Sequence, residues 1–532
     1  VEAVARMKVL ITDPIHQEGL DILEAQPDLT IELRPRMPLD ELLDAVASAE
    51  ALIVRSETQV TAAVIEAGER LQVVGRAGVG VDNIDVDAAT RRGIAVVNAP
   101  TGNTIAAAEH TIAIMLSMAR NIPQANASLR EEKWNRSAFI GTEVKGKTLG
   151  IVGLGRVGSE VARRALGMEM RVMGYDPYLV PERAARLGVE IASFDDVLGQ
   201  SDIVTLHTPL TDTTKSLIGP DEMARMKPGA RLVNVARGGL VDEAALLQAL
   251  DEDRLAGAAI DVFVDEPLKD FTIAQHPRIV CTPHLGASTE EAQAGVTLEV
   301  VDQVLTVLRG QPARFTVNAP LVTAEVHELL EPFLSVATDI GKIAIQTAQG
   351  LPRSATIAYH GELAAGETGP LRAAVLMGLL QPGREERVNL VNAGLLAEEQ
   401  GLRVIEEKDP AREDFANEVI VRLSTTQGEE IVGGTHLRGQ THVTRLGEHH
   451  LDVIIDSPYL LVVENEDRPG IIGTVGSLAG QHDVNISFME VGRVRTRGKA
   501  TMVVGLDDPM PEAVLQELAK EPAITSVRLV RL

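Results

Sequence analysis

The sequence contains very little cysteine and few aromatic residues. Its 532 residues include one cysteine, Cys281, which excludes an internal disulfide framework and a cysteine-rich zinc site. Phe, Trp and Tyr make up 2% of the chain, so aliphatic side chains must fill the core, and base-stacking platforms for single-stranded nucleic acid are not expected. We therefore expect no metal site, and we interpret Cys281 as a small buried apolar residue.

Positive charge is also scarce. The chain has 50 Lys and Arg against 76 Asp and Glu, a net charge of −26 at pH 7, and such a chain repels nucleic acid and anionic membranes. No apolar run approaches the ~18–20 residues that span a bilayer, and the residues ahead of Met7 lack the apolar core of a signal peptide. We expect a cytoplasmic protein in which residues 1–6 are an extension. An anionic substrate would need a local cationic pocket.

The order of apolar segments predicts an α/β fold with several domains. A length of 532 residues corresponds to about three to five domains. Short apolar runs alternate with helical patterns from Lys8 to about Val97, and again from Lys147. This alternation is typical of doubly wound parallel sheets with helices on both faces. The second series has predicted strands at 148–152, 171–175, 203–206, 231–234, 257–261 and 278–281, and long helices are predicted over 103–120 and 288–309.

The chain changes character after Pro312. From 318 to 456, helix and strand patterns are separated by glycine-rich joints and contain no phosphate-binding motif, which indicates an α+β domain. From 457 to 532 the order is strand, helix, strand, strand, helix, strand. That order is typical of the ferredoxin-like βαββαβ arrangement.

A glycine motif opens the second α/β series. Gly153, Gly155 and Gly158 form a GxGxxG pattern between a predicted strand and a predicted helix. Such glycines allow a tight turn, close approach to a pyrophosphate and close helix packing, and the helix N-terminus favours an anion. Asp176 lies 23 residues beyond Gly153, where a carboxylate binds a ribose diol and repels a 2′-phosphate. The motif predicts NAD rather than NADP, and the alternative is a glycine turn in another kind of α/β domain.

Three polar side chains follow later predicted strands: Arg237, Glu266 and His284. Ligands of open α/β sheets bind at the carboxyl ends of strands. A guanidinium can hold the carboxylate of a 2-hydroxy acid, an imidazole can accept its hydroxyl proton, and a carboxylate can stabilise the imidazolium. Singly, these residues have simpler interpretations as a surface ion-pair partner, a helix-entry residue and a core histidine. Together they predict an acid–base site for hydride transfer.

The chain resembles the D-isomer-specific 2-hydroxyacid dehydrogenase family, and within it the long D-3-phosphoglycerate dehydrogenases with an intervening domain and a C-terminal ACT domain. The resemblance covers nearly all of residues 7–532. It implies NAD-dependent oxidation of D-3-phosphoglycerate to 3-phosphohydroxypyruvate, the first step of L-serine biosynthesis, by a homodimer or homotetramer. The strongest stretches are 54–58, 74–85, 146–158, 233–242 and 283–289.

The resemblance also implies roles for individual residues. Arg237, Glu266 and His284 correspond to the catalytic residues, with His284 as the acid/base. Val79 stands where some relatives carry Thr, so no side-chain hydroxyl contact to the cofactor is expected there. The implied NAD contacts are Gly153, Gly155, Arg156, Val157, Gly158, Asp176, Thr208, Val235, Asp261, His284, Gly286 and Ala287.

The resemblance implies that the first domain is discontinuous in sequence. Residues 7–100 and 290–317 form the substrate-binding domain around a Rossmann NAD-binding domain at 101–289, so that the active site lies between them. An intervening domain at 318–456, similar to an allosteric substrate-binding domain, and an ACT domain at 457–532 follow. A phosphorylated substrate needs cations besides Arg237, and we expect Arg55 and Arg76 to supply them; ordinary surface arginines are the alternative.

The ACT resemblance implies L-serine as an effector bound between paired ACT domains at Asn465, Asp467 and Asn485. From the residues alone, Asp467 and Asn485 are more simply interpreted as turn-closing residues. Lys133 and Arg136 flank Trp134, the only tryptophan, and are weaker candidates for contact with a neighbouring subunit. Two other functions stay open: a dehydrogenase or reductase for another 2-keto or 2-hydroxy acid such as glyoxylate, and a non-catalytic NAD-sensing protein.

Overall fold

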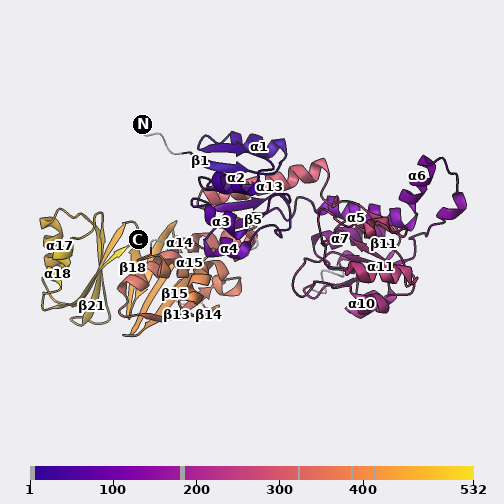
Figure 1. Ribbon diagram of the computed structural model, residues 1–532. Helices are drawn as coiled ribbons and strands as arrows, with labels where there is room; N and C mark the ends of the chain where they lie inside the picture. Colours follow the sequence, from indigo (N-terminus) through magenta and orange to yellow (C-terminus); the bar gives the residue numbers. More distant parts are fainter. Residues whose placement is uncertain (1–5, 180–185, 321–323, 385–386, 412–414) are drawn as a thin grey trace.

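The computed structural model describes residues 6–179, 186–320, 324–384, 387–411 and 415–532 (Figure 1). The first sheet is parallel, with the strand order β2-β1-β3-β4-β5. Its central strands are short apolar runs buried on both faces, as a covered parallel sheet requires. The strands are β1 (Met7–Ile11), β2 (Leu29–Leu33), β3 (Ala51–Val54), β4 (Val73–Arg76) and β5 (Ala95–Asn98).

Helices cover both faces of this first sheet. The face that carries Val9 and Ile11 packs against α1 and against the much later helix α13. The face that carries Leu10 and Leu52 packs against α2, α3 and α4. A helix from beyond the second sheet thus returns to complete the first core. The bounds are α1 (Gln17–Glu24), α2 (Leu39–Val46), α3 (Ala62–Ala67), α4 (Val86–Arg91) and α13 (Glu290–Leu308).

The second sheet is also parallel, with the order β12-β11-β10-β9-β6-β7-β8. The chain order reverses between β6 and β9, and the crevice at such a switch point is where doubly wound folds bind ligands. β8 lies beyond the six predicted strands, because two exposed residues leave no apolar signal in the sequence. The strands are β6 (Thr148–Val152), β7 (Arg171–Tyr175), β8 (Glu190–Ile191), β9 (Ile203–Leu206), β10 (Ala230–Asn234), β11 (Leu255–Ile260) and β12 (Ile279–Cys281).

The helices of the second sheet also form two layers. One core contains α5 and α7, and the other contains α9, α10 and α11. Helix α6 and the 3-10 turn η1 extend away from this body as an arm (Figure 1). The bounds are α5 (Thr104–Ala119), α6 (Ile122–Arg130), η1 (Arg136–Phe139), α7 (Arg156–Gly167), α9 (Phe194–Gln200), α10 (Pro220–Arg225), α11 (Glu243–Asp251) and α12 (Thr272–Gln275).

The third sheet is mixed, as the α+β prediction requires. Its order is β14-β13-β15-β16-β17-β18, with β13 and β14 parallel and the other neighbours antiparallel. Helices α14, α15 and α16 contribute to its core. The elements are α14 (Ala324–Thr347), β13 (Pro352–Gly361), η2 (Glu362–Ala365), α15 (Gly369–Leu380), α16 (Ala393–Glu399), β14 (Arg403–Asp409), β15 (Asn417–Thr425), β16 (Glu429–Leu437), β17 (Gln440–Leu446) and β18 (His449–Ile454).

The fourth sheet has the predicted ferredoxin-like arrangement. Its antiparallel order is β20-β21-β19-β22. Leu461 and Val463 pack against α17 and α18, whereas Leu460 and Val462 on the opposite face join the core of the third sheet. The elements are β19 (Tyr459–Glu466), α17 (Ile471–Gln481), β20 (Ile486–Arg493), β21 (Lys499–Leu506), α18 (Glu512–Leu518) and β22 (Ile524–Arg531).

Cys281 is partly buried, and burial, with a smaller contribution from Glu243, raises the pKa of its thiol to about 12. No helix of the described ranges is long and apolar enough to cross a membrane. Within the same ranges, no three His, Cys, Asp or Glu side chains gather in a way that would hold a metal ion.

Candidate active site

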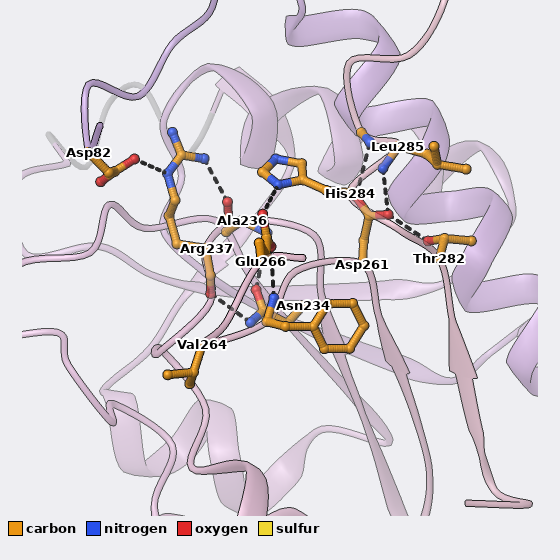
Figure 2. A network of polar contacts seen from close by, with 12 residues as sticks. Asp82, Asn234, Ala236, Arg237, Asp261, Val264, Glu266, Thr282, His284 and Leu285 are labelled. Atoms are coloured by element: carbon orange, nitrogen blue, oxygen red, sulfur yellow. Dashed lines mark hydrogen bonds and ion pairs between the residues drawn. The ribbon is translucent and has the colours of Figure 1, made fainter. Parts of the chain in front are cut away.

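The three predicted acid–base residues follow adjacent strands. Arg237 lies in the loop after β10, Glu266 in the loop after β11 and His284 in the loop after β12. These strands are parallel neighbours at one side of the second sheet. Their carboxyl ends therefore open at the same edge of the sheet, and Figure 2 shows the three side chains within one polar network.

His284 and Glu266 form a direct pair. His284 Nδ1 lies 2.6 Å from Glu266 Oε2, and Glu266 Oε1 accepts a hydrogen bond of 2.9 Å from the Phe263 amide (Figure 2). Burial acts to raise the pKa of Glu266, but the hydrogen bonds from His284 and Phe263 outweigh it, and the pKa lies below its usual range. His284 Nε2 has no hydrogen-bond partner among the described residues, so it is open to a substrate.

The backbone of His284 is held in an uncommon conformation. Its φ of 55° lies in the left-handed region, which non-glycine residues rarely adopt without support from their surroundings. The His284 amide donates to the carbonyl of Asp261 at 2.8 Å. The next two amides, of Leu285 and Gly286, donate to the Asp261 carboxylate at 2.8 and 2.9 Å.

Asp261 is the centre of this support, although the sequence predicted it as a cofactor contact. Its side chain is fully buried, and it also accepts from Thr282 Oγ1 at 2.6 Å and lies 3.1 Å from His110 Nε2. Burial acts to raise the pKa of Asp261, but the hydrogen bonds from His110, Thr282 and Leu285 hold it below its usual range. An ionised carboxylate thus joins helix α5 to the loop that carries His284.

His110 was missed in the sequence. It is one polar residue in an apolar helix, and neither spacing nor a motif connects it with strand ends 150 residues away. The available signal was a histidine inside a segment predicted to be buried, which requires a polar partner. Its partners are Asp261 and Thr282, from the ends of β11 and β12.

Arg237 links the second sheet to the first. Its Nη1 donates to the Ala236 carbonyl at 2.7 Å, and its Nε lies 3.3 Å from Asp82 Oδ2 in the loop after β4 (Figure 2). The buried Asn234 shapes this turn, because its amide donates to the Arg237 carbonyl and accepts from the Ala236 amide. Asp82 was also missed, because only the approach of the two sheets places it beside Arg237.

Positive charges gather beside Arg237. Arg76 ends β4 and Arg55 follows β3, as predicted. Burial and, to a smaller extent, the positive charges of Arg237 and Arg55 lower the pKa of Arg76 to about 10, although Asp82 and Asp13 oppose the shift. Arg76 is therefore within electrostatic reach of both Arg237 and Arg55. Such an arrangement is unfavourable on its own and favours an anionic ligand.

The glycine loop fits a dinucleotide. Gly153 has a φ of 94°, and a Cβ there would lie 2.5 Å from the His207 carbonyl oxygen; a Cβ on Gly158 would lie 2.0 Å from the Gly153 carbonyl oxygen. At Gly155 there is open space, and α7 begins beside it with no side-chain cap. The free amides at this helix end are suited to a pyrophosphate.

The other predicted cofactor residues lie around this loop. Asp176 follows β7 and holds the loop, because its Oδ2 accepts from the Leu154 amide at 2.9 Å. Thr208 Oγ1 is buried and lacks a hydrogen-bond partner in the described part of the chain. Arg156 and Val157 open α7, Val235 is buried after β10, and Ala287 precedes α13. A cofactor that reaches from α7 to the end of β12 would pass all of them.

The structure places the predicted effector residues at separate contacts. The Asn465 amide donates to the Glu466 carbonyl, and Asn485 donates to Asp507 at 2.6 Å. Asp467 accepts from the Arg497 amide at 3.0 Å and from Arg493 Nη1 at 2.8 Å, and these bonds lower its pKa. Within the described ranges, no hydrogen bond joins the three residues to one another.

Comparison with known proteins gives the family. Residues 112–286 match the NAD binding domain of the D-isomer specific 2-hydroxyacid dehydrogenases, residues 329–445 the D-3-phosphoglycerate dehydrogenase intervening domain, and residues 459–523 the ACT domain. The chain is 44% identical over 527 residues to the D-3-phosphoglycerate dehydrogenase of Synechocystis sp., covering 99% of this chain and 95% of the relative. It belongs to the D-3-phosphoglycerate dehydrogenase family.

Other relatives agree along the whole length. The D-3-phosphoglycerate dehydrogenase of Archaeoglobus fulgidus is 41% identical, with 99% of this chain and 100% of the relative covered. Among solved structures, the D-lactate dehydrogenase from Aquifex aeolicus, complexed with NAD and lactic acid, matches with a TM-score of 0.53 and 28% identity, covering 57% of this chain and 96% of that one. Family membership confirms the predictions of the α/β fold, of an oxidoreductase and of NAD as cofactor.

Proposed function

We propose that the chain is a cytoplasmic enzyme that oxidises D-3-phosphoglycerate to 3-phosphohydroxypyruvate with NAD, the first step of L-serine biosynthesis. The observation that carries this proposal is the placement of a cluster of guanidinium groups beside an imidazole–carboxylate pair. The substrate has a carboxylate, a phosphate and a C2 hydroxyl group. The cluster can hold its two anionic groups while the pair acts on its hydroxyl group.

The catalytic roles follow from the chemistry of each side chain. Arg237 holds the substrate carboxylate, because its fork of N–H groups matches that geometry. His284 takes the C2 hydroxyl proton at Nε2, since Nδ1 is committed to Glu266. Glu266 stays ionised and stabilises the imidazolium as it forms. When bound, NAD supplies the acceptor for the hydride that leaves C2.

Arg76 and Arg55 are proposed to hold the phosphate. Both lie at the ends of strands of the first sheet, and Arg76 interacts electrostatically with Arg55 and with Arg237 of the second. An unphosphorylated acid such as glyoxylate has no second anionic group to place beside Arg55 and Arg76. The cluster therefore favours a phosphorylated substrate over that alternative, and the complete catalytic trio supports an enzyme over a non-catalytic NAD sensor.

The cofactor is proposed to lie along the carboxyl edge of the second sheet. Gly153, Gly155 and Gly158 with Arg156 would bind the pyrophosphate at the start of α7. Asp176 would accept hydrogen bonds from the adenosine ribose, which favours NAD over NADP. Thr208, whose buried hydroxyl lacks a partner among the described residues, would supply a further hydrogen bond. The residues from Asp261 to Ala287 would adjoin the nicotinamide.

We also propose the domain boundaries given by the sequence: 7–100 with 290–317, 101–289, 318–456 and 457–532. The junction between the first two has a specific contact, because the Glu299 carboxylate on α13 accepts from the amides of Thr101 and Gly102 at 3.0 and 3.2 Å. Rotation about this junction would close the cleft and exclude water from the reaction.

The test of the activity is a comparison of two substrates. The rate of NADH oxidation is measured with 3-phosphohydroxypyruvate and with glyoxylate, using the same enzyme preparation for both. We expect kcat/KM to be at least about a hundredfold higher for the phosphorylated acid, the effect of about 2–3 kcal/mol from charge-assisted contacts. Equal kcat/KM values, or a preference for glyoxylate, would favour a dehydrogenase or reductase for another 2-keto or 2-hydroxy acid. An absence of NADH oxidation with either acid would favour a sensor.

A dimer is proposed from the arm formed by α6 and η1. Trp134 is 84% exposed and Ile140 82% exposed on this arm, which extends from the second sheet (Figure 1). Large exposed apolar side chains on a projecting segment are suited to a partner surface, and a second copy of the chain is the partner we propose. Sedimentation velocity of Trp134→Ala with Ile140→Ser tests this: a shift toward monomer supports it, and an unchanged assembly contradicts it.

L-serine is proposed as the effector of the ACT domain, through Asn465, Asp467 and Asn485. An amino group that approaches Asp467 must compete with Arg493, its present partner. Calorimetry of the full chain with L-serine and with D-serine tests the proposal. We expect L-serine to bind and Asp467→Ala to weaken that binding at least about tenfold, as loss of a charge-assisted hydrogen bond requires. No heat with L-serine would contradict it.

A further inference from the structure

A cavity lies between the first sheet and the third. It has a volume of about 610 Å³ and is bounded by the C-terminal half of α13, the segment 310–320, helices α14 and α15, and the segment 387–391. Ligand pockets for small molecules have volumes of about 300–1,000 Å³. None of the residues proposed above for catalysis, cofactor or effector binding lines this cavity.

The cavity lining is mostly apolar, and it includes two arginine side chains without an ion-pair partner among the described residues. Arg314 and Arg387 both line the cavity, and neither guanidinium group has a hydrogen bond or ion pair with any residue that the structure describes. Unpaired guanidinium groups next to apolar walls are suited to an organic anion, because the carboxylate or similar group pairs with the cation while the body packs on the wall. The apolar lining residues include Val307, Phe315, Leu334, Pro370, Met377 and Val391.

The acidic residues of the lining are already engaged. The Glu299 carboxylate accepts from the Thr101 and Gly102 amides at 3.0 and 3.2 Å. Asp302 accepts a long hydrogen bond of 3.4 Å from Gln303. Neither carboxylate forms an ion pair with Arg314 or Arg387 in the described part of the chain, so both guanidinium groups stay available to an anionic ligand.

The walls are fixed to each other by a motif that the proposed activity does not use. The segment Arg387–Ala393 contains Asn389, whose amide donates to the Gly93 carbonyl in the first sheet unit at 2.6 Å. The Asn389 and Asn392 side chains also accept from the backbone of this turn, at 3.0 Å from the Val391 amide and 2.8 Å from the Asn389 amide. These bonds fix the turn that follows Arg387, one of the lining residues, against the first sheet unit.

One cavity residue connects the site with the cofactor loop. The Phe315 ring lies 4.9 Å from the Arg314 guanidinium and 6.0 Å from that of Arg156. Arg156 is the first residue of α7, directly after the glycine loop. The ring thus contacts a cation of the cavity and a cation of the proposed cofactor site, both within the range of cation–π attraction. A ligand that pairs with Arg314 changes the surroundings of the same ring.

We propose that this cavity is a regulatory site for an organic anion with an apolar body, bound by Arg314 and Arg387 and coupled to NAD affinity through Phe315 and Arg156. The coupling rests on the proposed function in assigning Arg156 to the cofactor site. Anion binding at the cavity is measured without turnover, so that measurement does not depend on the proposed function. By linkage, an anion that changes NAD affinity must itself bind with an affinity that NAD changes by the same factor.

The binding test uses octanoate as the probe. Calorimetry is done on the full chain saturated with NAD, for the wild type and for Arg314→Ala, Arg387→Ala, Arg237→Ala and Arg309→Ala. Arg309 is the matched control, because it is an exposed arginine at the end of α13 that does not line the cavity. We expect one octanoate per chain, at least tenfold weaker binding in Arg314→Ala and Arg387→Ala, and unchanged binding in Arg309→Ala and Arg237→Ala.

Two results would contradict the proposal that the cavity binds an organic anion. One is the absence of octanoate binding to the wild type at millimolar concentration. The other is binding that survives in Arg314→Ala and Arg387→Ala but is lost in Arg237→Ala, which would place octanoate in the catalytic cleft. A failure of the proposed function alone is distinguishable, because it would leave the octanoate affinities as expected while 3-phosphohydroxypyruvate is not reduced.

The coupling test measures NADH affinity from its fluorescence, with and without saturating octanoate. We expect the Kd for NADH to change at least twofold in the wild type and to stay the same in Phe315→Leu, which lacks the ring between the two cations. An unchanged Kd in the wild type, or an equal change in Phe315→Leu, would contradict the coupling.

Discussion

His284 Nδ1 lies 2.6 Å from Glu266 Oε2, so one nitrogen of the imidazole is committed to a carboxylate, while the other, Nε2, has no hydrogen-bond partner among the described residues. The Glu266 carboxylate has a lowered pKa and stays ionised at neutral pH. Its negative charge favours the protonated imidazole.

Glu266→Gln removes this charge while it keeps the shape of the side chain. Oxidation needs the neutral imidazole, and without the carboxylate the imidazolium is less stable. We expect the acidic limb of kcat/KM for D-3-phosphoglycerate oxidation to move to lower pH by about one unit, which corresponds to about 1.4 kcal/mol, with a lower plateau. The measurement is the pH profile of both enzymes in the same buffers. A limb at the same pH in both would rule out this role for Glu266.

Arg76→Ala tests the assignment of the phosphate. The buried Asp13 near Arg76 keeps its hydrogen bonds from the Arg55 amide and from Thr58, so the loss of Arg76 removes a phosphate partner without leaving that carboxylate unpaired. We expect KM for 3-phosphohydroxypyruvate to rise at least about tenfold, a cost of about 1.4 kcal/mol, while kcat/KM for glyoxylate changes less than threefold. Arg36→Ala is the control, since Arg36 is an exposed arginine of the same sheet unit that pairs with Glu57. Equal effects on the two acids would show that Arg76 does not bind phosphate.

His110→Ala tests the support of the His284 loop. The substitution removes one partner of the buried Asp261 carboxylate, and a lost hydrogen bond to a charged group costs about 1.5–3 kcal/mol. We expect a lower Tm and a kcat reduced about tenfold, in keeping with the cost of small misplacement of a catalytic group, with KM for NADH changed less. His110→Gln, which keeps a donor, should recover much of both. Wild-type kcat and Tm in His110→Ala would contradict the positioning role.

Local sequence patterns explain most of the fold and part of the site. The strands of the two parallel sheets are apolar runs such as Ala51–Val54 and Thr148–Val152, and these could be read directly because both of their faces are buried. Arg237, Glu266 and His284 could be predicted because each comes directly after such a run. The short, exposed β8 gives no comparable signal.

The unpredicted parts depend on contacts between distant segments. Asp82 meets Arg237 because two sheets approach each other, and His110 meets Asp261 because α5 covers the ends of β11 and β12. The cavity at Arg314 and Arg387 is lined by residues of α13, α14 and α15, which are distant in sequence. None of these relations leaves a period or a motif in one stretch of sequence. Asp467 was predicted at its turn, but its ion pair with Arg493 was not.

The most direct measurement for the whole account is the turnover of His284→Asn with NADH and 3-phosphohydroxypyruvate, alongside the Kd for NADH from its fluorescence. If His284 Nε2 transfers the proton, kcat falls by about 10²–10⁴-fold, the usual contribution of a general acid, while the Kd for NADH stays within twofold. A variant that binds NADH normally and keeps near-normal kcat/KM would contradict the account.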